Sequence, residues 1–144
     1  MKRENGFTLV EILVVVAIVG ILAAIAVPQY SDYVTRSKLA EATATLSETR
    51  VKLEQYFQDN RTYVGACAAG TVAPLPTGRY FAYTCPTLTA TTFVVTATGV
   101  ASEGMADFIF TINQANTRAT TSTPATWGSL TSASCWINKK SGTC

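Results

Sequence analysis

The chain has 144 residues, a formal net charge of +2 and no histidine. This length allows one globular domain together with a hydrophobic segment, and the near-neutral charge argues against a dedicated electrostatic nucleic-acid binder. The lack of histidine removes the commonest general base and metal ligand, and the sequence contains no phosphate-binding loop or nucleophile elbow. We therefore predict that the chain is not an enzyme and uses no cofactor or metal.

The first six residues, MKRENG, form a short polar segment, and an apolar run from Phe7 to Val27 follows whose one formal charge is Glu11. As a helix, these 21 residues would span about 31 Å, the thickness of a bilayer's hydrocarbon core. Lys2 and Arg3 favour a cytoplasmic N-terminus, so the rest of the chain would cross the membrane. A carboxylate in that layer costs about 3 kcal/mol, so we expect Glu11 to be functional and to have a cationic partner.

The order of these signals differs from that of a secretory signal peptide, whose cleavage site follows its apolar core. Here the small residue, Gly6, precedes the core, and cleavage after Gly6 would leave the hydrophobic helix on the mature protein. The cut would also create an amine at Phe7, one turn from Glu11, where opposite charges attract more strongly than in water. The alternative is an uncleaved single-pass anchor whose Glu11 reaches the headgroups.

The combination of Gly6, the FTLVE segment Phe7–Glu11, a long aliphatic run and Pro28 resembles the N-terminal pattern of the type IV pilins. The six-residue leader is similar to that of the type IVa class, and the resemblance covers residues 6 to about 35. It implies an inner-membrane prepilin that inner-membrane assembly machinery polymerises into an extracellular fibre. Adhesion, twitching motility and DNA uptake are the fibre functions that the resemblance suggests.

The resemblance also implies roles for individual residues. A prepilin peptidase would cut between Gly6 and Phe7 and methylate the new amino terminus of Phe7. Glu11 would neutralise the terminal ammonium of a neighbouring subunit, and Thr8 can add a hydroxyl donor. The segment from Gly20 to Pro28 would unwind when subunits pack in the fibre, whereas from the residues alone Pro28 predicts a simple kink.

After Pro28 the helical pattern continues to about Gln58 and becomes amphipathic. One apolar stripe is formed by Leu39, Ala42, Leu46, Thr49, Leu53, Tyr56 and Phe57. The opposite face carries Lys38, Glu41, Glu48, Arg50, Lys52 and Glu54, with Glu48 and Lys52 spaced for an ion pair. We expect the stripe to cover a folded domain and the apolar half of the helix to protrude.

The rest of the chain predicts an antiparallel sheet. Residues 64–78 are rich in glycine and proline and indicate an irregular loop. Strands are expected at Arg79–Thr84, Thr92–Thr98, Ala106–Ile112 and, more weakly, Thr117–Thr120. The fold class is therefore α+β, a pilin-like roll in which the helix packs on a four-stranded antiparallel sheet. The expected organisation is a leader at 1–6, an assembly helix at 7–28 and a periplasmic domain at 29–144.

Four cysteines, Cys67, Cys85, Cys135 and Cys144, lie beyond the apolar segment and form no CxxC pair. They suggest disulfides in an oxidising compartment. Of the three possible connectivities we favour the sequential one, because it closes the two shortest loops. Each such bridge would contribute about 3 kcal/mol in the chain-entropy model.

Two alternative functions remain open. A type II secretion pseudopilin shares the N-terminal design, but such proteins commonly carry a C-terminal calcium site, and Asp107 is the last acidic residue here. A DNA-receptor minor pilin is the other, since Arg118, Lys139 and Lys140 make the tail locally basic. Three charges on a threonine-rich surface are usually only solvated. Trp127 and Trp136 could bind a ligand, but buried core positions are expected for both.

Overall fold

The computed structural model describes residues 7–144. Its longest element is helix α1, Leu9–Asn60, which continues without a break through Pro28. The hydroxyl of Ser31 donates to the Pro28 carbonyl at 2.9 Å, which satisfies that side chain inside the helix. The chain divides into two compact units between Thr35 and Arg36. We call residues 9–35 the N-terminal half of α1 and residues 36–60 its C-terminal half.

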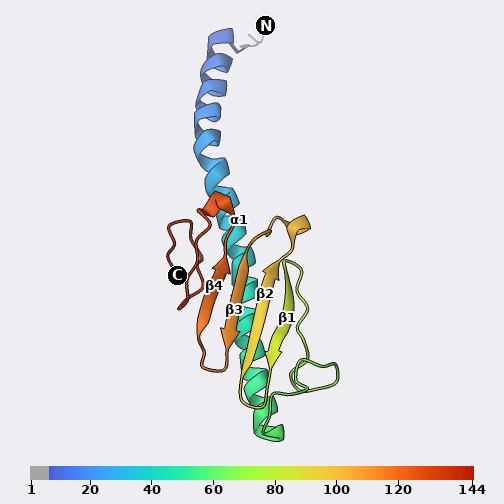
Figure 1. The fold of residues 1–144 in the computed structure, drawn as a ribbon. Coiled ribbons are helices and arrows are strands. Elements are labelled where there is room, and N and C mark those ends of the chain that lie inside the picture. The colour runs from blue at the N-terminus through green and yellow to red at the C-terminus, as the bar shows by residue number, and fades with distance from the viewer. Residues whose placement is uncertain (1–6) are drawn as a thin grey trace. The chain divides into compact units, whose positions relative to one another are not determined.

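The C-terminal half of α1 packs against the sheet through the predicted stripe (Figure 1). The buried residues of the helix are Leu39, Ala42, Leu46, Thr49 and Leu53. The expected ion pair is present, with 2.7 Å between Lys52 Nζ and Glu48 Oε1. Two residues expected on the opposite face instead reach the domain. Lys38 donates to the carbonyl of Glu103 at 2.7 Å, and the Glu41 carboxylate accepts from the Tyr80 amide at 3.3 Å.

The sheet is a four-stranded antiparallel meander in the order β1-β2-β3-β4, as predicted (Figure 1). Its strands are β1 (Phe81–Leu88), β2 (Phe93–Gly99), β3 (Ile109–Asn113) and β4 (Arg118–Ser122). Buried and exposed residues alternate along them, so one face of the sheet meets α1 and the other does not.

Two strand boundaries differ from the prediction by three residues or more. β1 continues beyond Thr84 to Leu88, because a bulge between Thr84 and Thr87 lets the strand pass Pro86 and resume pairing. β3 begins at Ile109 and not at Ala106, because Asp107 adopts a left-handed φ of 66° that a strand does not allow. Gly99 ends β2 where a Cβ would lie 1.8 Å from the Met105 carbonyl oxygen, so the chain can turn back here only at glycine.

The core lies between the sheet and the C-terminal half of α1 and is rich in aromatic side chains. Its largest fully buried members are Phe81, Phe93, Phe108, Phe110, Leu39, Leu46, Leu53, Met105 and Ile112. Both tryptophans are buried, as expected. Trp127, in the short helix η2 (Ala125–Trp127), meets Phe108 edge to face at 5.0 Å, and Trp136 donates to the Thr111 carbonyl at 2.9 Å.

Two disulfides hold the irregular segments. Cys67 is bonded to Cys85, which ties the loop after α1 to β1. Cys135 is bonded to Cys144, so the last residue of the chain is fixed to the C-terminal loop. This is the pairing that closes the two shortest loops.

Candidate assembly site

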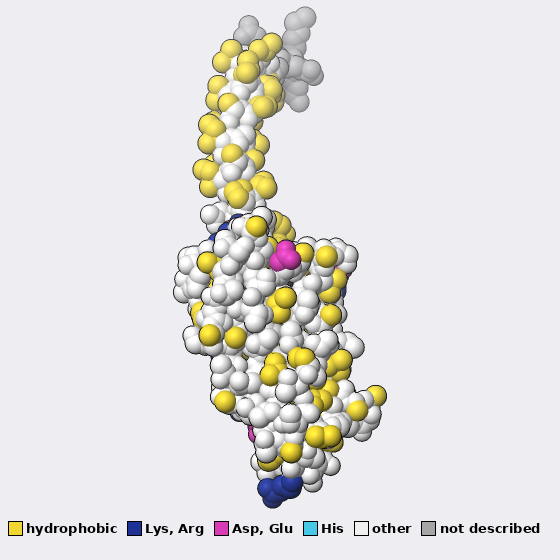
Figure 2. Space-filling model, viewed as in Figure 1, with side chains coloured by type: hydrophobic (Ala, Val, Ile, Leu, Met, Phe, Trp, Pro, Cys, Tyr) yellow, Lys and Arg dark blue, Asp and Glu magenta, His cyan; other side chains and the backbone are white. Residues whose placement is uncertain are grey.

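The N-terminal half of α1 is exposed on all sides. Every side chain from Phe7 to Ser31 is exposed, including aliphatic residues that domains normally bury. Figure 2 shows these hydrophobic side chains along the segment. An 18-residue window of α1 has a mean hydropathy of 3.0 and no buried residue, so the helix is long and apolar enough to cross a membrane. An apolar surface of this extent marks a site that meets lipid or another protein.

Glu11 carries the single formal charge between Phe7 and Ser31, and Thr8 holds its carboxylate. Glu11 Oε2 accepts hydrogen bonds from the Thr8 amide and from the Thr8 hydroxyl, each at 3.0 Å. The Glu11 amide donates in turn to Thr8 Oγ1 at 3.2 Å. This reciprocal arrangement is a capping box, in which two amides at the start of a helix are satisfied by side chains.

The capping box is a role for Glu11 that our sequence reasoning missed. Its signal was present, since Thr8 and Glu11 have the Thr-x-x-Glu spacing directly before an apolar run. Free amides at a helix end are costly in lipid, so the cap alone gives this carboxylate a structural use. Both bonds converge on Oε2, and Oε1 makes no hydrogen bond to any described residue. The second oxygen therefore remains available to a cation.

The other residues predicted at this end lie as follows. Gly6 lies outside the described residues, and Phe7, the first described residue, is 84% exposed. Gly20 and Pro28 both lie inside α1. A Cβ built at Gly20 would meet nothing within 4 Å, so packing within this chain does not require glycine there.

The three cations of the tail lie at the other end of the sequence. Arg118 begins β4, and its guanidinium carbon lies 5.0 Å from the centre of the Trp136 ring. Lys139 and Lys140 are exposed in the C-terminal loop. In the part of the chain that the structure describes, no three cysteine, aspartate or glutamate side chains gather as a metal site.

Two family models match the chain, and together they cover residues 1–108. The model "Prokaryotic N-terminal methylation motif" matches residues 1–27. This motif and the helix-on-sheet fold agree with a type IV pilin. The second model, "Type IV minor pilin ComP, DNA uptake sequence receptor", matches residues 28–108, more than half of the chain. The chain belongs to this ComP family of type IV minor pilins.

The curated relatives that match the chain are named as fimbrial proteins. The fimbrial protein EcpC of Eikenella corrodens is 38% identical over 95 residues, which are 66% of this chain and 62% of that protein. A fimbrial protein of Pseudomonas aeruginosa is 42% identical over 66 residues, 46% of this chain and 43% of its own length. A probable minor fimbrial protein of Dichelobacter nodosus is 45% identical over 65 residues, 45% of this chain and 41% of its own length. The chain thus spans about half the length of these relatives.

One solved structure shares the fold. The non-core minor pilin PilV of Neisseria meningitidis superposes with a TM-score of 0.52 at 20% identity, covering 62% of this chain and 88% of that chain. The predicted α+β pilin fold and the predicted family are therefore confirmed. The family and the relatives are structural pilins and not enzymes, so this chain is a structural protein of that class.

Proposed function

We propose that the chain is a prepilin that is inserted in the inner membrane and polymerised into an extracellular fibre. A prepilin peptidase would remove residues 1–6 and methylate the new amino terminus at Phe7. The exposed apolar half of α1 would hold the subunit in the bilayer before assembly and pack against other copies afterwards. Inner-membrane assembly machinery would perform the transfer, because the chain contains no nucleotide-binding loop of its own.

The observation that supports this proposal is that Glu11 Oε1 makes no hydrogen bond to any residue that the structure describes. Cleavage would give each subunit an ammonium group at Phe7, and Glu11 Oε1 of an adjoining subunit is free to accept it. In an apolar surrounding the attraction between such charges is several times stronger than in water. A subunit that lacked either charge would leave the other unpaired, which costs about 3–5 kcal/mol for a buried pair.

Thr8 would prepare Glu11 for this contact. Its two hydrogen bonds fix the carboxylate at the start of the helix before a partner arrives. A side chain that is already held in place loses less conformational entropy on binding. We therefore assign Thr8 a positioning role and Glu11 the charge that selects the neighbour.

We further propose that Gly20–Pro28 unwinds in the assembled fibre. Pro28 lacks the amide that would bond to the preceding turn, and Gly20 has a weaker preference for helix than any residue except proline. Amide hydrogen exchange in sheared fibres should be faster there than in Leu39–Tyr56. Equally slow exchange in the two segments would contradict unwinding.

Mass spectrometry of the sheared surface fraction tests the processing and export steps together. The expected result is a chain that begins at a methylated Phe7 and keeps Cys67–Cys85 and Cys135–Cys144 oxidised. A chain that still carries residues 1–6 in that fraction would contradict the proposal. So would a protein found in the membrane alone while fibres of other pilins are recovered.

DNA binding is the second candidate function, because the matched family model is described as a DNA uptake sequence receptor. In this chain Arg118, Lys139 and Lys140 are the cations of a tail without any acid after Asp107. Three phosphate contacts predict a log–log salt slope of about −2.7 for duplex DNA. Salt-insensitive or absent binding of the full chain in detergent would dismiss this function.

A further inference from the structure

A polar groove separates α1 from the C-terminal loop within the globular domain. Its main hollow has a volume of about 430 Å³ and is lined by Thr43 and Ser47 of α1, Arg118 of β4, and Ser134, Trp136 and Asn138 of the loop. A second hollow of about 300 Å³ shares Thr43 and Asn138 with it and reaches Arg36. We call the two together the C-terminal groove. Its size lies in the range of small-molecule sites.

Arg118 is an exposed cation at the edge of the groove. The guanidinium has five N–H donors, yet it makes no hydrogen bond or salt bridge to any described residue. It stacks over Trp136, whose indole N–H donates to the Thr111 carbonyl and whose side chain is 8% exposed. No aspartate or glutamate lines either hollow, and no salt bridge joins Arg118 to the terminal carboxylate of Cys144, which lines the larger one. The groove therefore favours a ligand that carries a negative charge opposite Arg118.

The remaining lining groups are neutral hydrogen-bonding groups. The hydroxyls of Thr43 and Ser47 donate to helix carbonyls at 3.2 and 2.8 Å, which leaves their oxygen lone pairs as acceptors. The hydroxyl of Ser134 and the side-chain amide of Asn138 make no hydrogen bond to a described residue. These donors and acceptors can form hydrogen bonds to a ligand that carries several hydroxyls around one charge.

Two other ligand classes fit less well. A nucleobase needs an open aromatic face, and the ring of Trp136 is buried and already covered by Arg118. A chain of phosphates needs a row of cations, whereas neutral groups predominate around Arg118. We propose that the C-terminal groove binds a saccharide with one carboxylate per unit, of the uronic acid class. Arg118 would pair with the carboxylate in two parallel hydrogen bonds.

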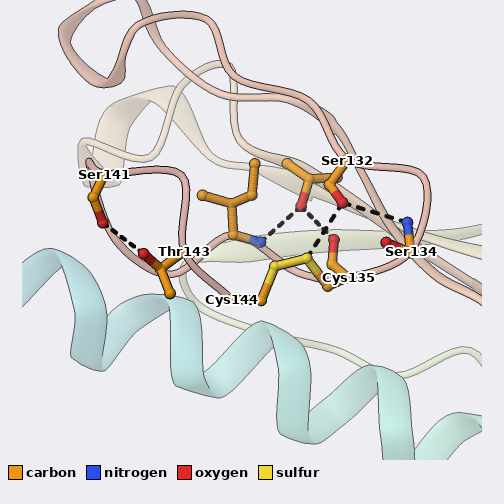
Figure 3. Close-up of a disulfide and its surroundings, with 8 residues drawn as sticks. Ser132, Ser134, Cys135, Ser141, Thr143 and Cys144 are labelled. Carbon is orange, nitrogen blue, oxygen red and sulfur yellow. Dashed lines mark hydrogen bonds between the residues drawn. A yellow bond between two sulfur atoms is a disulfide. The ribbon is translucent and has the colours of Figure 1, made fainter.

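The structure holds the loop side of this groove in place. Thr120, 1% exposed, donates its hydroxyl to the Cys135 carbonyl at 3.0 Å and accepts from the Ile137 amide at 2.9 Å. The Cys135–Cys144 disulfide lies between this loop and α1, and Figure 3 shows it with the neighbouring serines. The groove is therefore formed in a single subunit and does not need the fibre. In a fibre, repeated copies would add avidity, a gain that rests on the proposed function.

Calorimetric titration of the full chain in detergent micelles tests the proposal, with tetragalacturonate as the probe and its methyl ester as the uncharged control. We expect the acid to bind at least about tenfold more tightly than the ester. R118Q should weaken binding of the acid by about tenfold or more, and R118K should weaken it less, because lysine keeps the charge but loses the planar fork. R61Q is the matched control, since Arg61 lies outside the groove, and it should bind as the unchanged chain does.

Three results would overturn the proposal. Equal affinity for the acid and the ester would show that the charge is not recognised. Unchanged binding by both R118Q and R118K would place any site elsewhere. Arg118-dependent binding of a 12-base-pair duplex without any binding of tetragalacturonate would make the groove a phosphate site. If R118Q does not fold, the affinity of R118K for the acid decides the question, with an unchanged far-ultraviolet circular dichroism spectrum as the check that R118K is folded.

Discussion

The two halves of α1 belong to one continuous helix, yet one half buries apolar side chains and the other exposes them. In the C-terminal half, five residues on one stripe are buried by the sheet of the same chain. In the N-terminal half, every side chain as far as Ser31 is exposed. The first arrangement contributes to the stability of one subunit, whereas the second leaves an apolar surface that the described chain does not cover. We therefore propose that one half of this helix serves folding and the other half serves assembly.

The sharpest test of this contrast compares one leucine from each half. L46A removes a fully buried side chain from the stripe and should destabilise the domain by about 2–5 kcal/mol. L13A truncates a side chain that is 61% exposed and should leave the unfolding free energy unchanged. Urea unfolding in detergent, followed by tryptophan fluorescence, measures both. A loss of similar size in L13A would mean that the N-terminal half also stabilises the domain.

A second test concerns how the C-terminal loop is fixed to β4. T120V keeps the shape of the side chain but leaves the buried Cys135 carbonyl and Ile137 amide without the hydroxyl, so we expect a loss of about 2 kcal/mol. T98V is the control, because Thr98 is exposed on β2 and its hydroxyl bonds to no described residue. Equal unfolding midpoints for T120V and T98V would show that the loop is held by other contacts.

The smallest expected effect lies between α1 and β1 and depends on pH. Burial raises the pKa of the Tyr83 hydroxyl, the Thr45 side chain partly offsets this shift, and Glu41 raises the pKa further. No hydrogen bond of good geometry joins the hydroxyl to a described residue. An unfolded tyrosine ionises near pH 10, so the folded domain should lose stability as the pH rises above about 10. Y83F should reduce that alkaline loss and be neutral or stabilising by up to about 1 kcal/mol at pH 7.

Unfolding of Y83F at pH 7 and at pH 10.5 checks this prediction against the unchanged chain. Y33F, which alters a tyrosine that is 71% exposed, is the control. An alkaline loss as large in Y83F as in Y33F would contradict a role for the buried hydroxyl.

Periodicity predicted much of this fold because each signal is local. The stripe from Leu39 to Leu53 follows the helical repeat, and the alternation around Phe93–Gly99 follows the strand repeat, so both were found. The end of β1 was missed because Pro86 argues against a strand, and the bulge that admits it depends on pairing with β2. The contacts of Lys38 and Glu41, which the sequence predicts only on the face opposite the stripe, were missed because their partners, Glu103 and Tyr80, are distant in sequence.

The candidate site was predicted unevenly for the same reason. The single charge of Glu11 in an apolar run is visible in the sequence, and the N-terminal methylation motif model matches the residues around it. The Thr-x-x-Glu spacing of Thr8 and Glu11 is also a local signal, but we did not predict the capping box from it. The unpaired Arg118 above Trp136 could not have been predicted, since it depends on where the C-terminal loop crosses β4.

The central claim is that the charge of Glu11, and not its capping bond, recruits the neighbouring subunit. E11Q tests it directly, because glutamine can take the glutamate position of a capping box while carrying no charge. T8A is the matched variant, since it removes the two hydrogen bonds of the Thr8 hydroxyl and keeps the charge of Glu11, at a cost of about 1 kcal/mol to the helix. The measurement is the number and length of surface filaments by electron microscopy in cells where both variants are expressed and processed. We predict few or no filaments with E11Q and filaments with T8A. Normal numbers of full-length filaments with E11Q would contradict the account.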